Sequence, residues 1–315
     1  MEFKTLVETI KSYYTDLSES EIQKISEGFE YLETSGTKIQ QAQSHDILKR
    51  IIRLNPGVDT ICTILIQGFP TDDPFLEDQY YNSTIKFLHQ NLEKLKNITA
   101  RSDTEDSENI KRILIALSKD IRVLIIHLAR YVWRLQNANT QEPKNAEVLA
   151  RTGLKIHAPI AEKLDMYVLK AEIEDASFKI LNPELFDEIE ADSIQNETQQ
   201  DIIKEAIQTI QKILKDNKLD KTRVEGRKKN VYSVYEKMKR KNFHSVREVY
   251  DLFAIRIITQ TPEECYQILG QIHTHFTPIT SRFKDFIAVP KSNGYKSIHT
   301  TVLGLGSNPN LKKYL

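Results

Sequence analysis

The sequence predicts a multidomain protein in which an all-helical domain precedes an α/β domain. Three observations lead to this prediction. Apolar residues recur with a period of about 3.6 residues through roughly the first half of the chain, as in amphipathic helices. After residue 220 the pattern changes to a basic helix, a strand rich in Ile, a second helix and a hairpin, which together describe an α/β unit. The length of 315 residues leaves room for two domains.

The composition narrows the class of protein. Forty-four basic residues balance 44 acidic ones, so no net charge attracts the whole chain to DNA or to acidic membranes. The two cysteines, Cys62 and Cys265, lie far apart, which is typical of free thiols in a reducing compartment. The chain shows no signal-peptide pattern and no apolar run as long as a membrane span. We therefore expect a cytoplasmic protein with no membrane partner and no DNA partner.

The helical part begins with a clear start signal. Ser18 stands three residues before Glu21, which is a capping-box pattern. Helical periodicity then recurs through "SHDILKRIIRL", "VDTICTILIQGF", "STIKFLHQNLEKL" and "NIKRILIALSKDIRVLIIHLARYVWRL". Helices continue to "DIIKEAIQTIQKILKDNK", whose apolar stripe identifies it as the expected connector to the α/β part.

Positive charge is concentrated between residues 221 and 247, where ten Lys or Arg residues stand against two Asp or Glu. A helix beginning near Asn230 would place Ser233 and Lys237 on one side of it, so that cations and helix N-terminal amides converge on phosphates. A solvated basic helix is the plainer alternative. RNA binding through the same segment is a third interpretation, which the scarcity of further exposed aromatic residues disfavours.

Two charged residues belong to the strand "DLFAIRII". Asp251 stands at its start, where a carboxylate can hold Mg²⁺ opposite a triphosphate, although such a residue is more often a cap or a surface group. Arg256 follows five positions later, which places it on the opposite face of a regular strand.

A hairpin is predicted in "DFIAVPKSNGYKSIHTTVLG". Asn293 and Gly294 form a strong turn signal between the expected strands 286–289 and 295–303. Because side chains alternate along a strand, one outward face would carry Tyr295, Ser297, His299 and Thr301. Such a face can stack on a base and contact phosphate or ribose, or it can be an ordinary solvated sheet.

Together these segments resemble a known family. The runs "GRKKNVYSVYEKM", "YDLFAIRI", "CYQILGQIHTHF" and "RFKDFIAVPKSNGYKSIHTTVLG" are similar to the synthetase domain of the RelA/SpoT family, the long alarmone synthetase/hydrolases of the bacterial stringent response. Upstream, "KDIRVLIIHLA" and "APIAEKLDMYVLKAEIEDASFKILNPELF" resemble the end of the hydrolase domain and the helical bundle after it. The resemblance implies an all-α HD-hydrolase-like domain over residues 1–150, a helical connector bundle over 151–218 and an α/β nucleotidyltransferase-like synthetase domain over 219–315.

The resemblance also implies an activity. The family transfers the β,γ-pyrophosphoryl group of ATP to the 3′-hydroxyl of GDP or GTP, producing (p)ppGpp. The residues implied for ATP binding are Arg227, Lys229, Ser233 and Lys237. Those implied for GDP or GTP binding are Lys291, Asn293, Tyr295 and His299, with Tyr295 stacking on guanine. Asp251 and Arg256 are the implied catalytic residues, and Asp251 is the implied ligand of the cofactor Mg²⁺.

The hydrolase half departs from the family pattern. Gln67 and Gly68 stand where the family has a His-Asp pair, and Arg130 stands in place of a metal-binding Asp. These residues cannot hold the metal that generates hydroxide, so we expect no hydrolase activity. His45 is the expected remnant of the first ligand position.

The synthetase half also departs from the pattern. Residues 282–285 read "RFKD", a form typical of the family's bifunctional branch, which we interpret as ancestry. The family continues into a strand whose Glu assists the metal, and here Asn310 stands near that position. We therefore expect a fragment of a longer protein or an incomplete synthetase half. A catalytically incomplete nucleotide-binding or regulatory module remains the alternative function, and ribosome contact is expected only through a C-terminal region outside this chain.

Overall fold

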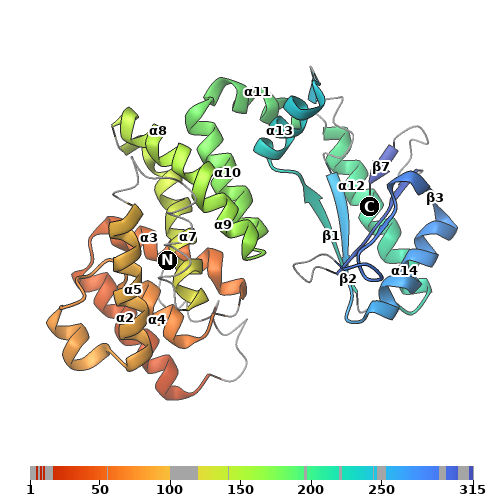
Figure 1. The fold of residues 1–315 in the computed structure, drawn as a ribbon. Coiled ribbons are helices and arrows are strands. Elements are labelled where there is room, and N and C mark those ends of the chain that lie inside the picture. Colours follow the sequence, from red (N-terminus) through yellow and green to blue (C-terminus); the bar gives the residue numbers. More distant parts are fainter. Residues whose placement is uncertain are drawn as a thin grey trace. The chain divides into compact units, whose positions relative to one another are not determined.

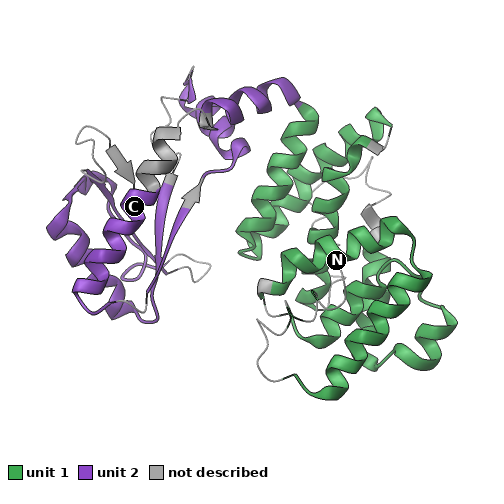
Figure 2. Ribbon diagram, turned by 180° about the vertical axis from the view of Figure 1, so that it is seen from behind, with its two compact units in different colours: residues 1–181 green, residues 182–315 purple. Residues whose placement is uncertain are grey.

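The structure is a computed structural model that describes most of the chain. The described residues are 5, 8, 10, 17–54, 56–99, 120–140, 142–194, 197–219, 222–243, 245–246, 253–290, 296–303 and 312–314. They form two compact units, residues 1–181 and residues 182–315, which Figure 2 colours green and purple. Each unit has its own hydrophobic core and is described by itself.

The first unit is all-helical, as predicted for this part of the chain (Figure 1). Its longer helices are α2 (Glu19–Ser35), α3 (Lys38–Ile51), α4 (Val58–Ile66), α5 (Ser83–Thr99), α7 (Ile121–Gln136), α8 (Pro143–Thr152) and α10 (Tyr167–Leu181). Shorter turns of helix are η1 (Ile52–Leu54), η2 (Leu76–Tyr80), η3 (Ala138–Thr140), η4 (Gly153–His157) and α9 (Ala158–Lys163). Among the described helices, none is both long and apolar enough to cross a lipid bilayer.

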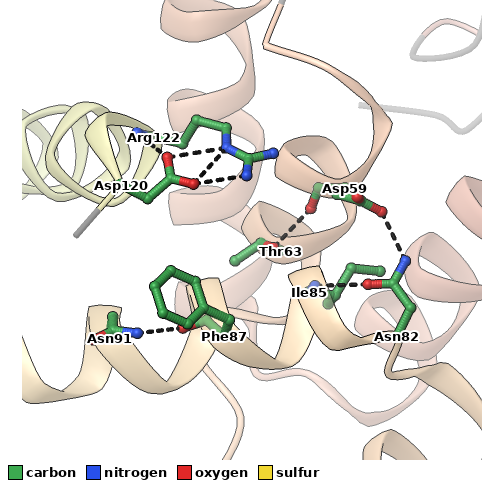
Figure 3. Close-up of polar contacts among 8 residues, drawn as sticks. All are labelled: Asp59, Thr63, Asn82, Ile85, Phe87, Asn91, Asp120 and Arg122. Carbon is green, nitrogen blue, oxygen red and sulfur yellow. Dashed lines mark hydrogen bonds and ion pairs between the residues drawn. The ribbon is translucent and has the colours of Figure 1, made fainter. Parts of the chain in front are cut away.

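Side-chain caps explain where several of these helices begin. The predicted capping box is confirmed, because the Ser18 hydroxyl accepts from the Glu21 amide at 3.3 Å and Glu21 binds the Ser18 amide at 2.9 Å. Figure 3 shows two further caps: Asn82 accepts from the Ile85 amide before α5, and Asp120 accepts from the Arg122 amide before α7. Asn82 also donates to Asp59 of α4 at 2.8 Å, which fixes the start of α5 against α4.

The second unit combines helices with a small sheet. Its helices are α11 (Pro183–Ile194), α12 (Glu197–Asp216), α13 (Val231–Lys241), α14 (Pro262–His275) and the short η6 (Thr280–Arg282). Its strands are β1 (Arg223–Lys228), β2 (Phe253–Ile258), β3 (Thr277–Pro278), β4 (Lys284–Asp285), β5 (Ile298–His299), β6 (Thr301–Leu303) and β7 (Lys312–Tyr314). One sheet has the order β1-β2-β7-β6-β3, and β4 and β5 form a separate ribbon.

The core of the second unit lies between α12, α14 and the sheet. Ile210 and Leu214 of α12 pack with Ile268 and Ile272 of α14 and with Val302 of β6. Alternate residues of β1 and β2 supply the sheet face, because Val224, Ile255 and Ile257 pack against this core. The helix predicted as a connector therefore contributes directly to the core of the α/β unit.

The packing boundary at residue 181 differs from the predicted division. Helices α8 and α10 pack on α7 of the first unit, whereas α12 packs with the sheet. The predicted connector bundle, residues 151–218, is thus shared between the two compact units. The three-part division into 1–150, 151–218 and 219–315 stays a prediction about domains.

An antiparallel pair of strands is present where the hairpin was predicted, but the two strands have other bounds than predicted. An antiparallel pair does enclose the Asn-Gly segment, but it joins Lys284 to His299 and Asp285 to Ile298. Residues 286–288 form a turn instead of the predicted strand, because Asp285 accepts backbone hydrogen bonds that bend the chain. The second predicted strand is divided, because the chain leaves the ribbon at Thr300 and enters the larger sheet at β6.

Candidate active site

The ATP-side residues lie around the end of β1 and the start of α13. Arg227 belongs to β1, Lys229 follows it, and α13 begins at Val231. Ser233 and Lys237 are one turn apart on the same side of α13, as predicted, and both are half-buried. A strand that delivers cations to a helix N-terminus is a favourable arrangement for phosphate oxygens, because the unsatisfied amides of the first turn carry partial positive charge.

The β1–β2 pair places one predicted site residue, Arg256, on a charged face. Glu225 lies opposite Arg256 in the antiparallel register, and Arg227 lies two positions from Glu225 on the same strand. Side chains opposite each other across a pair share a face, so Arg256 and Glu225 lie on one charged face of these strands. Arg223 occupies this face too and forms an ion pair with Glu225. The face carries more cations than carboxylates, which suits a polyphosphate.

His299 is the acceptor-side residue whose position is described. It is exposed on β5 opposite Lys284 of β4, and its ring meets the Phe286 ring edge-on with centroids 5.3 Å apart. Sequence reasoning missed Lys284 as its neighbour, because the strand was expected to begin at Phe286. Thr301 was predicted to share its outward face, but Thr301 is only 5% exposed, since the chain changes sheets at Thr300.

Four predicted site residues lie outside the described residues. They are Asp251, Lys291, Asn293 and Tyr295. The predicted Mg²⁺ ligand, the guanine stacking residue and two polar contacts to the acceptor nucleotide therefore stay predictions from the sequence.

The hydrolase-like positions Gln67, Gly68 and Arg130 lie in the first unit. Each of them forms a hydrogen bond with another residue of that unit. Gln67 follows α4, is 2% exposed, and donates from Nε2 to Oε1 of Gln43 at 3.4 Å. The carbonyl of Gly68 accepts from Nε2 of Gln40 at 2.6 Å. A Cβ added at Gly68 would come within 2.8 Å of Gln40 Cγ, so a longer residue there requires Gln40 to move.

Arg130 occupies the third hydrolase-like position as a buried cation. Its guanidinium donates to the carbonyl of Leu92 at 3.2 Å and lies 3.5 Å from the Glu93 carboxylate. Burial lowers the pKa of Arg130, and the attraction of Glu93 opposes that shift. Carboxylate and imidazole ligands are what a hydroxide-generating metal requires, and a guanidinium with amide neighbours does not fit it. In the described part of the chain, no three His, Cys, Asp or Glu residues gather as a metal site.

His45 lies on α3 with Gln43, and the expectation that it remains from the first ligand position stays a prediction. Gln43 and His45 are two positions apart on α3, which turns their side chains about 200° from each other. Gln43 contacts Gln67, whereas His45 stacks on Phe29 and lies 3.4 Å from a Glu33 oxygen. Burial is the main reason that the pKa of His45 is lowered.

Comparison with known proteins gives two family matches. Residues 226–313 match a family described as a region found in RelA / SpoT proteins, and residues 47–167 match the HD domain family. The first match covers the end of β1, β2 with Arg256, α13 and the β4–β5 ribbon. The second covers Gln67, Gly68 and Arg130.

Several curated proteins are similar along most of the chain. A guanosine-3′,5′-bis(diphosphate) 3′-pyrophosphohydrolase of Spiroplasma citri is 31% identical over 96% of this chain and 42% of its own length. A GTP pyrophosphokinase of Streptomyces coelicolor is 33% identical over 84% of this chain and 32% of its own. The bifunctional (p)ppGpp synthase/hydrolase SpoT of Escherichia coli is 31% identical over 78% of this chain and 36% of its own. The chain thus spans less than half the length of these relatives.

Proposed function

This chain belongs to the RelA/SpoT family of (p)ppGpp synthetases and hydrolases, and we propose that it is a (p)ppGpp synthetase whose hydrolase half is inactive. The observation that supports the synthetase assignment is the placement of Ser233 and Lys237 on one side of α13, whose N-terminus directly follows β1. The proposal that the hydrolase half is inactive rests on Gln67, Gly68 and Arg130 of this chain. The names of its relatives do not decide the question, because they include both hydrolase and synthetase activities.

The proposed reaction transfers the β,γ-pyrophosphoryl group of ATP to GDP or GTP. The acceptor 3′-oxygen forms a bond to the β-phosphorus while the bond from that phosphorus to the α,β-bridging oxygen breaks, and AMP leaves. Little covalent chemistry is required of the protein, so catalysis depends on position and charge. Arg227, Lys229 and Lys237 would hold the triphosphate, and Ser233 would donate a hydrogen bond to it.

Two further residues complete the proposed centre. Asp251 would hold Mg²⁺, which neutralises phosphate charge when bound. Arg256 would stabilise the charge that develops on the transferred group, because it is an exposed cation on the strand that pairs with β1. On the acceptor side, Tyr295 would stack on guanine, and His299, together with Lys291 and Asn293, would contact the rest of the nucleotide.

Tyr295 offers a direct test of the guanine site. Tyr295→Ala should weaken GDP binding by about 1 to 3 kcal/mol, the usual range for losing one base–aromatic stack. Titration calorimetry with GDP measures this change. The matched control is Tyr167→Ala, which removes a tyrosine 38% exposed on the first unit and should leave GDP affinity unchanged. Equal GDP affinity in Tyr295→Ala and the parent would place the guanine site elsewhere.

A further inference from the structure

Asp285 is held by three hydrogen bonds that the proposed reaction does not use. Its Oδ1 accepts from the backbone amides of Ile287 at 2.9 Å and Ala288 at 2.8 Å. Its Oδ2 accepts from the hydroxyl of Tyr266 on α14 at 2.9 Å. An ionised carboxylate has about four acceptor positions, so most of them are already occupied. The geometry points to a positioning role and not to a metal ligand.

The electrostatics of this contact agree with its geometry. The amide of Ala288, followed by the hydroxyl of Tyr266, holds the pKa of Asp285 below its usual range. The same hydrogen bond to Asp285 raises the pKa of Tyr266. At neutral pH the pair is therefore a charged acceptor with a neutral donor, which makes a stronger hydrogen bond than two neutral groups would.

These bonds attach a very short ribbon to α14. Strands β4 and β5 contribute two residues each, and an isolated two-stranded ribbon is marginally stable in water. Asp285 ties the β4 side to α14 through Tyr266. On the β5 side, His273 of α14 forms a hydrogen bond of 2.8 Å with the hydroxyl of Thr300, the residue after His299. The ribbon is thus anchored to one helix at both strands.

The anchored ribbon determines where His299 lies. Asp285 pairs with Ile298, and the amide of Phe286 donates to the carbonyl of Ser297 at 2.8 Å. The Phe286 ring then meets His299 edge-on. A shift of Asp285 would therefore move both the backbone that pairs with β5 and the aromatic ring beside His299.

We propose that Tyr266 and Asp285 are positioning residues for the acceptor nucleotide. They fix the β4–β5 ribbon to α14, so that GDP or GTP meets His299 in a preset position. This inference rests on the proposed function, because that function places the acceptor beside His299. Binding to a preset surface avoids the ordering cost that a loose ribbon imposes on its ligand.

The first unit contains a matched control for this contact. Tyr31 donates to Oδ2 of Asp73 at 2.8 Å, and Oδ1 of Asp73 accepts from the amides of Phe75 at 3.1 Å and Leu76 at 3.3 Å. The pattern is the same Tyr-to-Asp bond over two backbone amides. Tyr31→Phe and Tyr266→Phe therefore remove the same chemical group from the same kind of motif, and only the second motif carries the ribbon.

The test measures the dissociation constants of GDP and ATP for five proteins by titration calorimetry: the parent, Tyr266→Phe, Asp285→Asn, their double variant and Tyr31→Phe. Loss of one hydrogen bond to a charged group should raise the Kd for GDP roughly three- to tenfold in Tyr266→Phe and leave the Kd for ATP unchanged. Tyr266→Phe should weaken GDP binding less in the Asp285→Asn background than in the parent, since the two substitutions affect a shared interaction. Tyr31→Phe should match the parent. The ring resonances of His299, followed by NMR without nucleotide, should shift in Tyr266→Phe and in Asp285→Asn but not in Tyr31→Phe.

The outcomes separate this inference from the proposed function. A parent that binds ATP but no GDP overturns the proposed acceptor site and the inference with it. A parent that binds GDP, with a Tyr266→Phe variant of equal GDP affinity, overturns the inference and leaves the proposed function standing. Equal weakening of ATP and GDP binding in Tyr266→Phe also overturns it, because that result indicates a general loss of structure.

Discussion

Asp251→Asn should lower the rate of pyrophosphoryl transfer from ATP to GDP by about 10² to 10⁴, the usual contribution of a carboxylate that holds a metal or orients a nucleophile. The amide that replaces the carboxylate has no negative charge with which to hold Mg²⁺ against a triphosphate. The assay uses the longest natural form of the protein and follows labelled phosphate from ATP into the guanine nucleotide. The concentration of Mg²⁺ required for half-maximal rate should also rise.

A carboxylate elsewhere in the same unit provides the control. Asp216 is exposed at the end of α12 and belongs to no predicted site, so Asp216→Asn should transfer at the parent rate. An Asp251→Asn variant as active as the parent, with the same requirement for Mg²⁺, would show that the metal ligand has been assigned to the wrong residue.

Mild acid should destabilise the first unit through a buried pair of histidines. The Nε2 atoms of His127 and His157 lie 3.2 Å apart, and the Tyr131 ring stacks on His157 with centroids 3.6 Å apart. Burial lowers the pKa of His157 to about 3. Burial, with the charges of His157, Arg130 and Arg134, holds the pKa of His127 well below its usual value. Both rings are therefore neutral in the folded protein.

The direction of the effect follows from proton binding. The unfolded chain binds protons at these histidines below about pH 6.5, and the folded chain does not, so stability falls as the pH falls. When the pH falls from about 7 to 5, proton binding by each histidine in the unfolded chain should lower the free energy of unfolding by on the order of 2 kcal/mol. The size follows because one pKa unit corresponds to roughly 1.4 kcal/mol. Together the pair should account for up to about 4 kcal/mol.

The single tryptophan of the chain makes this prediction measurable. Trp133 lies on α7, two residues after Tyr131, so its fluorescence reports on the first unit during urea unfolding. His157→Gln should roughly halve the dependence of stability on pH. His275→Gln, at an exposed position on α14, should leave that dependence unchanged. The same pH dependence in His157→Gln and the parent would mean that the buried pair does not control acid stability.

Local patterns in the sequence predicted the fold class because their causes are local. The capping box at Ser18 and the periodicity of the first unit depend on residues within one or two helical turns, and the structure confirms both. The position of α12 was not predictable in the same way. Its apolar stripe shows that one face is buried, but only tertiary packing decides that Ile210 and Leu214 meet α14 and the sheet.

The local geometry of the predicted site residues was predictable on α13 but not around His299. Ser233 and Lys237 share a side of α13, as their spacing predicted. The strands around His299 were misplaced, because Asp285 accepts two amides and ends β4 before the apolar residues that suggested a strand. The roles of Tyr266 and Gln43 depend on contacts between distant segments, and no local signal identifies such partners.

The most direct test of an active synthetase beside an inactive hydrolase follows one label through both reactions. ATP labelled at its γ-phosphate is incubated with GDP, Mg²⁺ and the protein, and Mn²⁺ is then added to favour any hydrolase. The predicted result is label that accumulates in ppGpp and remains there, because Arg130, Gln67 and Gly68 stand where the proposed function requires metal ligands for hydrolysis to be missing. Release of the label as pyrophosphate after Mn²⁺ is added, or no label in ppGpp at any time, would contradict it.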